Sequence, residues 1–182
     1  MHGATALPCC RATTTPASDL HSFLSQQSRD AVSSHRSRRF VHNEELTALG
    51  HQVSVANSRG PETLADLAAE TGAKPVSVAK AARSGEVVIV TIPEKNIPKL
   101  PRDLFATTLD NVVIVDAGNY YPRQRDGRID AIEAGMTESR WVAQQLNRPV
   151  VKAFNNIYAR HLMELGRPNG TPGRIRLARS RR

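Results

Sequence analysis

This 182-residue sequence is poor in several residue types, and each shortage excludes a class of protein. Its two cysteines, Cys9 and Cys10, are adjacent, so they fit neither disulfide geometry nor the spacing of a zinc site. No apolar run exceeds four residues, as in Val87–Val90, which is too short to span a bilayer. Between Gly3 and Gly50 there is no glycine, which excludes a G-x-G-x-x-G turn there.

Positive charge is in excess, but it lies at the two ends of the chain. The formal net charge is +8. Residues 1–43 contain five arginines and two aspartates, residues 166–182 contain six arginines and no acid, and the middle contains fourteen bases and fifteen acids. A nucleic-acid-binding domain carries its basic patch on the folded body. We therefore do not expect a nucleic-acid partner; contact of the basic ends with nucleic acid or an acidic surface is the weaker alternative.

Both ends have the composition of tails. Residues 1–43 are rich in Ser, Thr, Arg and His without a sustained apolar period, which is typical of a disordered tail, with an organelle transit peptide as the alternative. Residues 166–173 contain three glycines and two prolines, which end regular structure. We predict a folded domain over residues 44–166 between basic tails at 1–43 and 167–182. Because no apolar core follows the first residues, we expect a cytoplasmic protein without a membrane partner.

Between these ends, strand and helix patterns alternate. Strands are expected at 52–57, 74–76, 86–92, 111–116 and 150–154, and helical segments at 61–71, 78–83, 97–105, 136–146 and 157–165. The β-branched runs at 86–92 and 111–116 are typical of strands that are buried on both faces. Crossovers of this length imply parallel strands with right-handed connections. The sequence therefore predicts an α/β fold, a Rossmann-like doubly wound parallel sheet.

A polar turn, Asn57-Ser58-Arg59, follows the first of these strands. A site specific for NAD carries Asp or Glu at the end of its second strand, and this turn has no acid. Ser58 can donate a hydrogen bond, Arg59 can pair with phosphate, and the helix that begins near Pro61 adds backbone amides. The turn suits the 2′-phosphate of NADP, although an ordinary polar turn is the alternative.

Four blocks of the sequence then carry a resemblance. They are LGHQVSVANSRGP at 49–61, VVIVTIP at 87–93, VDAGNYYP at 115–122 and VKAFNNIY at 151–158. In this order they resemble the NADPH-dependent deazaflavin reductases, the coenzyme F-420-dependent NADP oxidoreductase family, over roughly residues 45–175. The resemblance implies a hydride transfer between NADP(H) and a deazaflavin, coenzyme F-420, or a related acceptor. It also makes a homodimer an expectation.

The resemblance also assigns residues to the cofactor site. Ser58 and Arg59 would hold the 2′-phosphate, and the strand end at 91–93 would lie along the ribose and nicotinamide. Asn119, Tyr120 and Asn155 would lie near the place where the two cofactors meet. The cofactor-binding residues implied in this way are Asn57, Ser58, Arg59, Thr91, Ile92, Pro93, Asn119, Tyr120 and Asn155. Hydride transfer depends on stacking and alignment more than on an acid or base, so we nominate no catalytic residue. We interpret Asp116 as structural, with its carboxylate accepting hydrogen bonds from the backbone.

The sequence departs from the family at both ends. The family begins with a strand, a glycine-rich turn and a helix, whereas residues 46–49 resemble only the end of that helix. After Arg174 the family continues into a further strand and helices. We therefore expect a sheet incomplete at both ends, without its central strand and without a pyrophosphate-binding turn. The alternative to an active oxidoreductase is a truncated, non-catalytic remnant of the family that acts at most as a binding module.

Overall fold

The structure, a computed structural model, describes residues 6–11, 43–44, 46–167 and 170–173. It contains a six-stranded sheet in the order β3-β2-β1-β4-β5-β6, which is the strand order of a Rossmann fold. The predicted α/β fold is therefore confirmed. The strands are β1 (Ala6–Arg11), β2 (Gln52–Asn57), β3 (Lys74–Pro75), β4 (Val87–Val90), β5 (Val113–Asp116) and β6 (Val151–Lys152).

The helical segments lie largely where the sequence predicts them, except that the helix expected at 97–105 is a 3-10 helix at 94–99 followed by turns. A short helix covers 43–44 and 46–48. The others are η2 (Pro61–Leu64), α2 (Ala65–Thr71), α3 (Val78–Ser84), η3 (Glu94–Lys99), η4 (Pro122–Asp126), α4 (Asp130–Glu133), α5 (Glu138–Leu146) and α6 (Ala159–Leu165). The segments η4 and α4 were not predicted, since each is too short to show an apolar period. None of the described helices is both long enough and apolar enough to cross a membrane.

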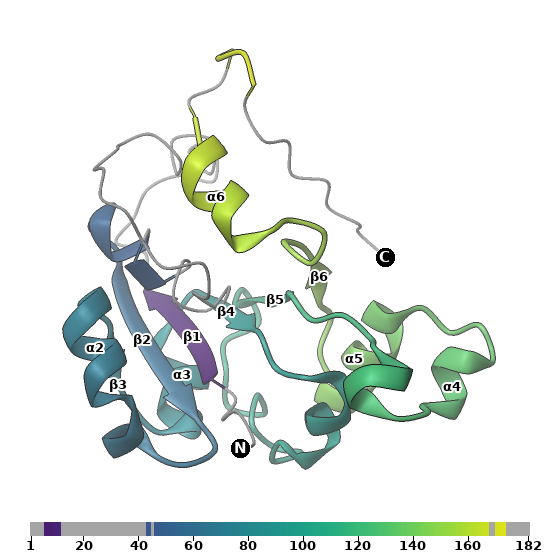
Figure 1. The fold of residues 1–182 in the computed structure, drawn as a ribbon. Helices are drawn as coiled ribbons and strands as arrows, with labels where there is room; N and C mark the ends of the chain where they lie inside the picture. The colour runs from purple at the N-terminus through teal and green to yellow at the C-terminus, as the bar shows by residue number, and fades with distance from the viewer. Residues whose placement is uncertain (1–5, 12–42, 45, 168–169, 174–182) are drawn as a thin grey trace.

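The central strand runs against its neighbours (Figure 1). β1 pairs antiparallel with β2, with Ala6 opposite Asn57 and Arg11 opposite Gln52, and it is also antiparallel to β4. The pairs β2–β3, β4–β5 and β5–β6 are parallel. Every strand except β1 therefore points in one direction, and the sheet is mixed rather than wholly parallel.

This strand corrects two expectations from the sequence. Residues 1–43 were all placed in a tail, and the central position of the sheet was expected to be empty, whereas Ala6–Arg11 occupies it. Pro8 concealed the strand, because proline has no N–H for a ladder and is uncommon in a central strand. Within the predicted tails, residues 1–5, 12–42, 168–169 and 174–182 lie outside the described residues.

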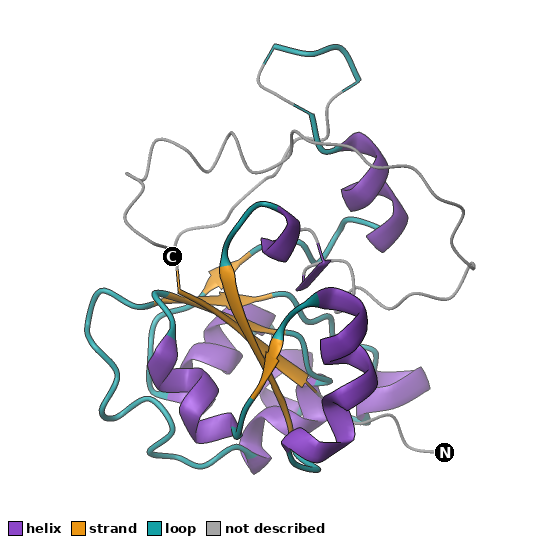
Figure 2. Ribbon diagram, turned by 90° about the vertical axis from the view of Figure 1, so that its left-hand side faces the viewer, coloured by secondary structure: helices purple, strands orange, loops and turns teal. Residues whose placement is uncertain are grey.

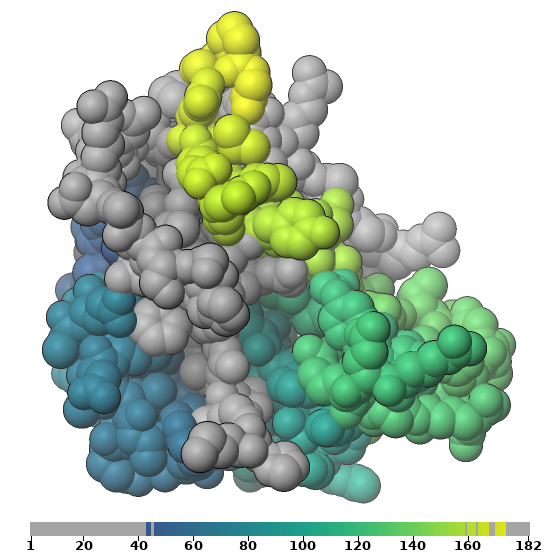
Figure 3. Space-filling view, viewed as in Figure 1, coloured from purple at the N-terminus to yellow at the C-terminus, as the bar shows by residue number. Residues whose placement is uncertain are grey.

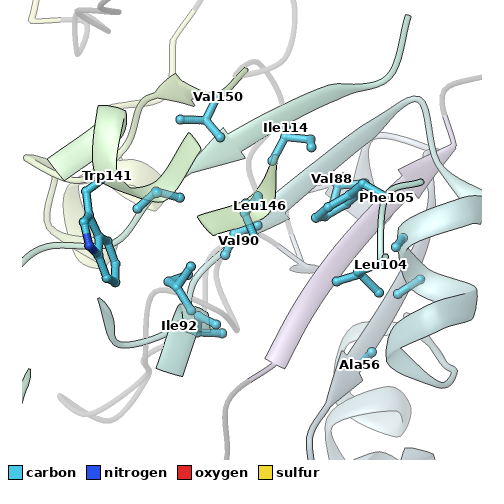
Figure 4. Packing of buried hydrophobic residues seen from close by; sticks show 14 of the residues in the cluster. Ala56, Val88, Val90, Ile92, Leu104, Phe105, Ile114, Trp141, Leu146 and Val150 are labelled. Carbon is cyan, nitrogen blue, oxygen red and sulfur yellow. The ribbon is translucent and has the colours of Figure 1, made fainter. Parts of the chain in front are cut away.

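Helices cover both faces of the sheet, as in a doubly wound fold (Figure 2). On one face, Val88 and Val90 of β4 pack with Trp141 of α5 and with residues of α3 and η3 (Figure 4). On the other face, Val55 of β2 packs with Leu67 of α2. These two clusters hold the strand ends rigidly, so the loops that follow the strands start from fixed positions. The last helix, α6, and residues 170–173 stand out from one end of the molecule (Figure 3).

Removal of residues 1–11 tests the role of β1. Among the described strands, β1 alone connects β2 to β4 in the sheet, so its loss leaves backbone groups of both strands unpaired, at about 1–3 kcal/mol for each buried group. We expect cooperative thermal unfolding to be lost, or its midpoint to fall by at least about 10 °C, as measured by circular dichroism. The control is Leu109→Ala, since this side chain is 72% exposed. An unchanged midpoint in the shortened chain would show that β1 does not stabilise the sheet.

Candidate functional site

Polar side chains gather at the edge of the sheet where β2, β4, β5 and β6 end. Because these strands point the same way, Asn57, Thr91 and Asp116 all reach this edge. Ligands of open α/β sheets bind at the carboxyl ends of the strands. We call this edge, with its loops, the carboxyl edge.

The turn after β2 is fixed from within by Asn57, whose side chain is buried. Its Oδ1 accepts the N–H of Arg59 at 2.9 Å, and its Nδ2 donates to Oγ1 of Thr63 at 2.8 Å. Gly60 follows with φ 102° and ψ 158°, a conformation that is essentially confined to glycine. Asn57 thus shapes the turn, since both groups of its side-chain amide bond within it.

Ser58 and Arg59 project from this turn into solvent. Neither side chain has a hydrogen bond or ion pair to another described residue, so a hydroxyl and a guanidinium are free to bind an anion. The carboxylate of Glu62 lies against Gly60, in the space that a side chain there would fill. The turn therefore offers two donors to a 2′-phosphate, with one acidic group beside them.

A cradle for the pyrophosphate of a dinucleotide is absent from the described residues. In a Rossmann fold the first strand ends at the carboxyl edge and turns through glycines into a helix, whose amides bind the pyrophosphate. Here β1 begins at this edge, with Ala6 beside Asn57, and it ends at the opposite edge. The sequence also has no glycine between Gly3 and Gly50. The residues therefore fit the 2′-phosphate end of NADP but not its pyrophosphate.

Two other residues assigned from the sequence, Asn119 and Asn155, meet across the ends of β5 and β6. Nδ2 of Asn119 donates to the backbone carbonyl of Asn155 at 2.8 Å, and Nδ2 of Asn155 lies 3.3 Å from Oδ1 of Asn119. Phe154 has φ 65°, which costs a bulky residue about 1–3 kcal/mol. This strained residue turns the chain so that Asn155 reaches the loop after β5.

Tyr120 points elsewhere. Its hydroxyl donates to Oε1 of Glu133 at 2.9 Å and accepts the N–H of Ile129 at 2.8 Å, so the phenol ties this loop to α4.

The strand end at 91–93 lies between the two groups of polar residues. Ile92 belongs to the buried core, and Thr91 and Pro93 are partly exposed. No hydrogen bond or ion pair among the described residues links the Asn57–Arg59 turn to the Asn119–Asn155 pair.

A buried group of charges that the sequence analysis did not identify lies at the same edge. Nζ of Lys152, at the end of β6, lies 2.8 Å from Asp116 Oδ2, 3.0 Å from Glu138 Oε2 and 3.5 Å from Glu94 Oε1. Glu94 is fully buried, and Lys152 is only 12% exposed. These four residues, which come from η3, β5, α5 and β6, are called the lysine cluster below.

The lysine cluster has one cation for three carboxyl groups, and its pKa values reflect this imbalance. Burial, followed by the charge of Asp116, raises the pKa of Glu94 from 4.5 to about 7, although Lys152 opposes the change. Burial lowers the pKa of Lys152, but attraction to Asp116 and hydrogen bonds to Asp116 and Glu138 outweigh it and raise that pKa overall. Lys152 therefore stays charged at neutral pH, while Glu94 changes its protonation state near neutral pH.

A second buried carboxylate, Asp126, organises the loop after β5. It accepts the N–H of Tyr121 at 2.8 Å and pairs with Arg125 at 2.9 Å. Arg125 also donates to the backbone carbonyl of Asn119 and lies 5.1 Å from the centre of the Tyr121 ring. Burial raises the pKa of Asp126, but the hydrogen bonds from Arg125 and Tyr121 outweigh it and lower that pKa overall.

Sequence reasoning identified the role of one member of the cluster and missed the others. Asp116 accepts the N–H of Gly118 at 2.9 Å, as expected of a structural carboxylate. Lys152 was the available signal, because a charged residue within a strand that is otherwise apolar needs a buried partner. No group of three or more His, Cys, Asp or Glu in the described part of the chain could hold a metal ion.

Comparison with known proteins finds the family that the sequence resembles, but only over part of the chain. Residues 42–120 match the model of the family described as NADP oxidoreductase, coenzyme F420-dependent. The match covers the first two blocks of the resemblance and the third as far as Tyr120, and the fourth block at 151–158 lies beyond it. No curated protein matches the chain.

One solved structure that resembles the chain is that of a hypothetical protein, SMa0349, from Sinorhizobium meliloti. The two are 26% identical, with a TM-score of 0.51, over 70% of this chain. The match spans only 58% of the length of that structure.

Glu94 predicts a specific pH dependence of stability. Its pKa is about 7 in the fold against an ordinary 4.5. The contribution of protonated Glu94 to the free energy of unfolding is therefore fully present below pH 4.5. That free energy falls by on the order of 3 kcal/mol as the pH rises to about 7. Asp126 acts in another window, since its pKa is lowered from 3.8 and its contribution is lost only as the pH falls below that value.

Urea unfolding between about pH 5 and about pH 8 measures this effect. Glu94→Gln keeps the shape of the side chain and should remove most of the loss. Asp110→Asn is the matched control, because Asp110 is a fully exposed carboxylate. Equal pH profiles for the wild type and Glu94→Gln would mean that Glu94 does not titrate in this range.

Proposed function

Because residues 42–120 carry a domain of the coenzyme F420-dependent NADP oxidoreductase family, we propose that the carboxyl edge binds NADP(H). We further propose that the chain transfers a hydride between NADP(H) and a deazaflavin or a related acceptor. The observation that carries this proposal is the turn after β2, where a fixed backbone holds the side chains of Ser58 and Arg59 in solvent, without a partner among the described residues.

Specificity for NADP over NAD follows from the chemistry of that turn. A ribose 2′-hydroxyl needs an acceptor, whereas a 2′-phosphate needs donors and positive charge. Ser58 and Arg59 supply donors and charge, whereas Asn57 is poorly placed for the acceptor role because its side chain is buried and its Oδ1 already accepts the N–H of Arg59. The turn therefore favours the phosphate.

The remaining residues would align the two reactants. When bound, NADP(H) supplies or accepts the hydride. The strand end at Thr91–Pro93 would form the floor of the site, and the Asn119–Asn155 pair would border the place where the acceptor ring stacks. Alignment of this kind accelerates hydride transfer without a side-chain acid or base.

The direction of β1 favours a second candidate, a nucleotide-binding module without hydride transfer. Without a pyrophosphate cradle, a dinucleotide would be held mainly by its 2′-phosphate end. Its nicotinamide would then be poorly fixed, and a misplacement of about 1 Å can cost a hundredfold in rate. Binding would persist while turnover is lost.

Two substitutions on the same turn should change NADPH affinity in opposite directions. Arg59→Ala removes a charge-assisted pair with the phosphate and should weaken binding by about tenfold or more. Glu62→Gln removes the carboxylate beside Gly60 and should strengthen binding by a fewfold. Isothermal titration calorimetry or quenching of Trp141 fluorescence measures both.

NADH provides the control for this pair, because it lacks the 2′-phosphate. Neither substitution should change the affinity for NADH by more than about twofold. If Arg59→Ala binds NADPH as tightly as the wild type does, the turn after β2 is not the phosphate site.

An anaerobic assay separates the two candidate functions. The purified chain is mixed with NADPH and a deazaflavin, and the nicotinamide absorbance is followed. We expect oxidation of NADPH that requires both the chain and the deazaflavin and that slows in Arg59→Ala at low NADPH. Saturable NADPH binding with no oxidation above the protein-free rate would support the binding module instead.

A further inference from the structure

The lysine cluster is connected to the loop Gly118–Tyr120 through two carboxylates. Asp116 places Oδ2 2.8 Å from Nζ of Lys152, while its Oδ1 accepts the N–H of Gly118 at 2.9 Å. Glu138 repeats this arrangement, with Oε2 3.0 Å from the same ammonium and Oε1 accepting the N–H of Tyr120 at 3.2 Å. Each carboxylate therefore joins the lysine to one backbone amide of the loop.

Glu94 is the third carboxyl group of the cluster, and it differs from the other two. It is fully buried, and neither of its oxygens accepts a hydrogen bond from a described residue. Its Oε1 lies 3.5 Å from Nζ of Lys152. A Cβ atom added at Gly118 would lie only 2.8 Å from this oxygen, so Glu94 lies directly beneath the loop.

We propose that Lys152 is a positioning residue for the loop Gly118–Tyr120, and that Glu94 makes this positioning depend on pH. When Glu94 carries a proton, the ammonium interacts only with Asp116 and Glu138, and both hold the loop. When Glu94 is ionised, a third carboxylate attracts the same ammonium. The pull on the other two then weakens, and the loop loosens as the pH rises.

Few other charged groups near Glu94 could make the loop Gly118–Tyr120 depend on pH. The charged groups that face Glu94 are Asp116 from β5, Lys152 from β6 and Glu138 from α5. On its own element, the N–H of Lys95 lies 3.4 Å from an oxygen of Asp126. The pKa of Asp126 is lowered and that of Lys152 is raised, so neither changes charge near neutral pH.

The consequence for binding rests on the proposed function. Asn119 lies within the loop and is paired with Asn155 at the carboxyl edge. A looser loop lets this pair move, and ordering it again on binding costs free energy. NADPH affinity should therefore fall as the pH rises, by about threefold or more between about pH 6 and about pH 8.

The first experiment needs no ligand. The amide resonances of Gly118 and Tyr120 are followed by nuclear magnetic resonance between about pH 5.5 and about pH 8.5. In the wild type and in the control Asp110→Asn, both should titrate together near neutral pH, and in Glu94→Gln both should stay unchanged. The proposal would be overturned if the two resonances do not change with pH in the wild type, or if they change equally in Glu94→Gln.

A further variant, Lys152→Met, tests the lysine itself. Loss of the ammonium should shift both amide resonances at every pH and remove their shared titration. If Lys152→Met does not fold, because it leaves buried carboxylates unpaired, the comparison of the wild type with Glu94→Gln still decides the question.

The second experiment measures the dissociation constant of NADPH against pH in the wild type and in Glu94→Gln. Because the 2′-phosphate itself titrates, the difference between the two proteins is the relevant quantity. Affinity should fall more steeply with pH in the wild type. If the amide resonances change with pH but NADPH does not bind at any pH, the positioning role is upheld and the proposed function is refuted. The opposite result is NADPH binding with the same pH dependence in both proteins and amide resonances that do not change with pH. It would support the proposed function and refute the positioning role.

Discussion

The backbone pairing of β1 with β2 and β4 is the interaction on which the rest of this structure depends. Without it, the sheet consists of two pieces, β3-β2 and β4-β5-β6. The Asn57–Arg59 turn belongs to the first piece, and the lysine cluster with the Asn119–Asn155 pair belongs to the second. The ladders of β1 therefore fix the two halves of the candidate site relative to each other, although β1 contributes only six residues.

The direction of that strand limits what the site can bind. A parallel β1 would end at the carboxyl edge and lead into amides that face a phosphate, whereas this strand starts there, with Ala6 beside Asn57. The nearby positive charge does not replace those amides, because Lys152 already pairs with buried carboxyl groups. Arg59, by contrast, has a side chain that is exposed and unpaired within the described residues, so its turn offers a cation to an anionic ligand.

Much of the fold could be predicted because its signals are local. The strand at Gln52–Asn57 has the predicted bounds, and the predicted helix ends at Gly72 and Gly166 also occur. Gly72 ends its helix in the left-handed conformation that glycine favours, with φ 69°. The strand β1 has no comparable signal: its position depends on partners more than forty residues later in the chain, and Pro8 argues against a central strand.

The candidate site shows the same division between local and tertiary information. Ser58 and Arg59 could be nominated because one turn contains all of the relevant chemistry. The lysine cluster could not, since η3, β5, α5 and β6 each contribute a single residue and nothing in the spacing of positions 94, 116, 138 and 152 brings them together. The sheet does so, by ending its parallel strands at one edge.

A buried carboxyl group such as Glu94 does not stabilise the fold once it is ionised. Ionisation in a buried place is costly, and an apolar residue of similar volume is often as good or better for stability. What distinguishes Glu94 from a tolerated defect is its connection to other groups. Asp116 and Glu138 each use one oxygen for the ammonium of Lys152 and the other for a backbone amide of the loop. A charge that displaces the ammonium must therefore act on that loop, which places a proton of near-neutral pKa in control of the part of the carboxyl edge that contains Asn119.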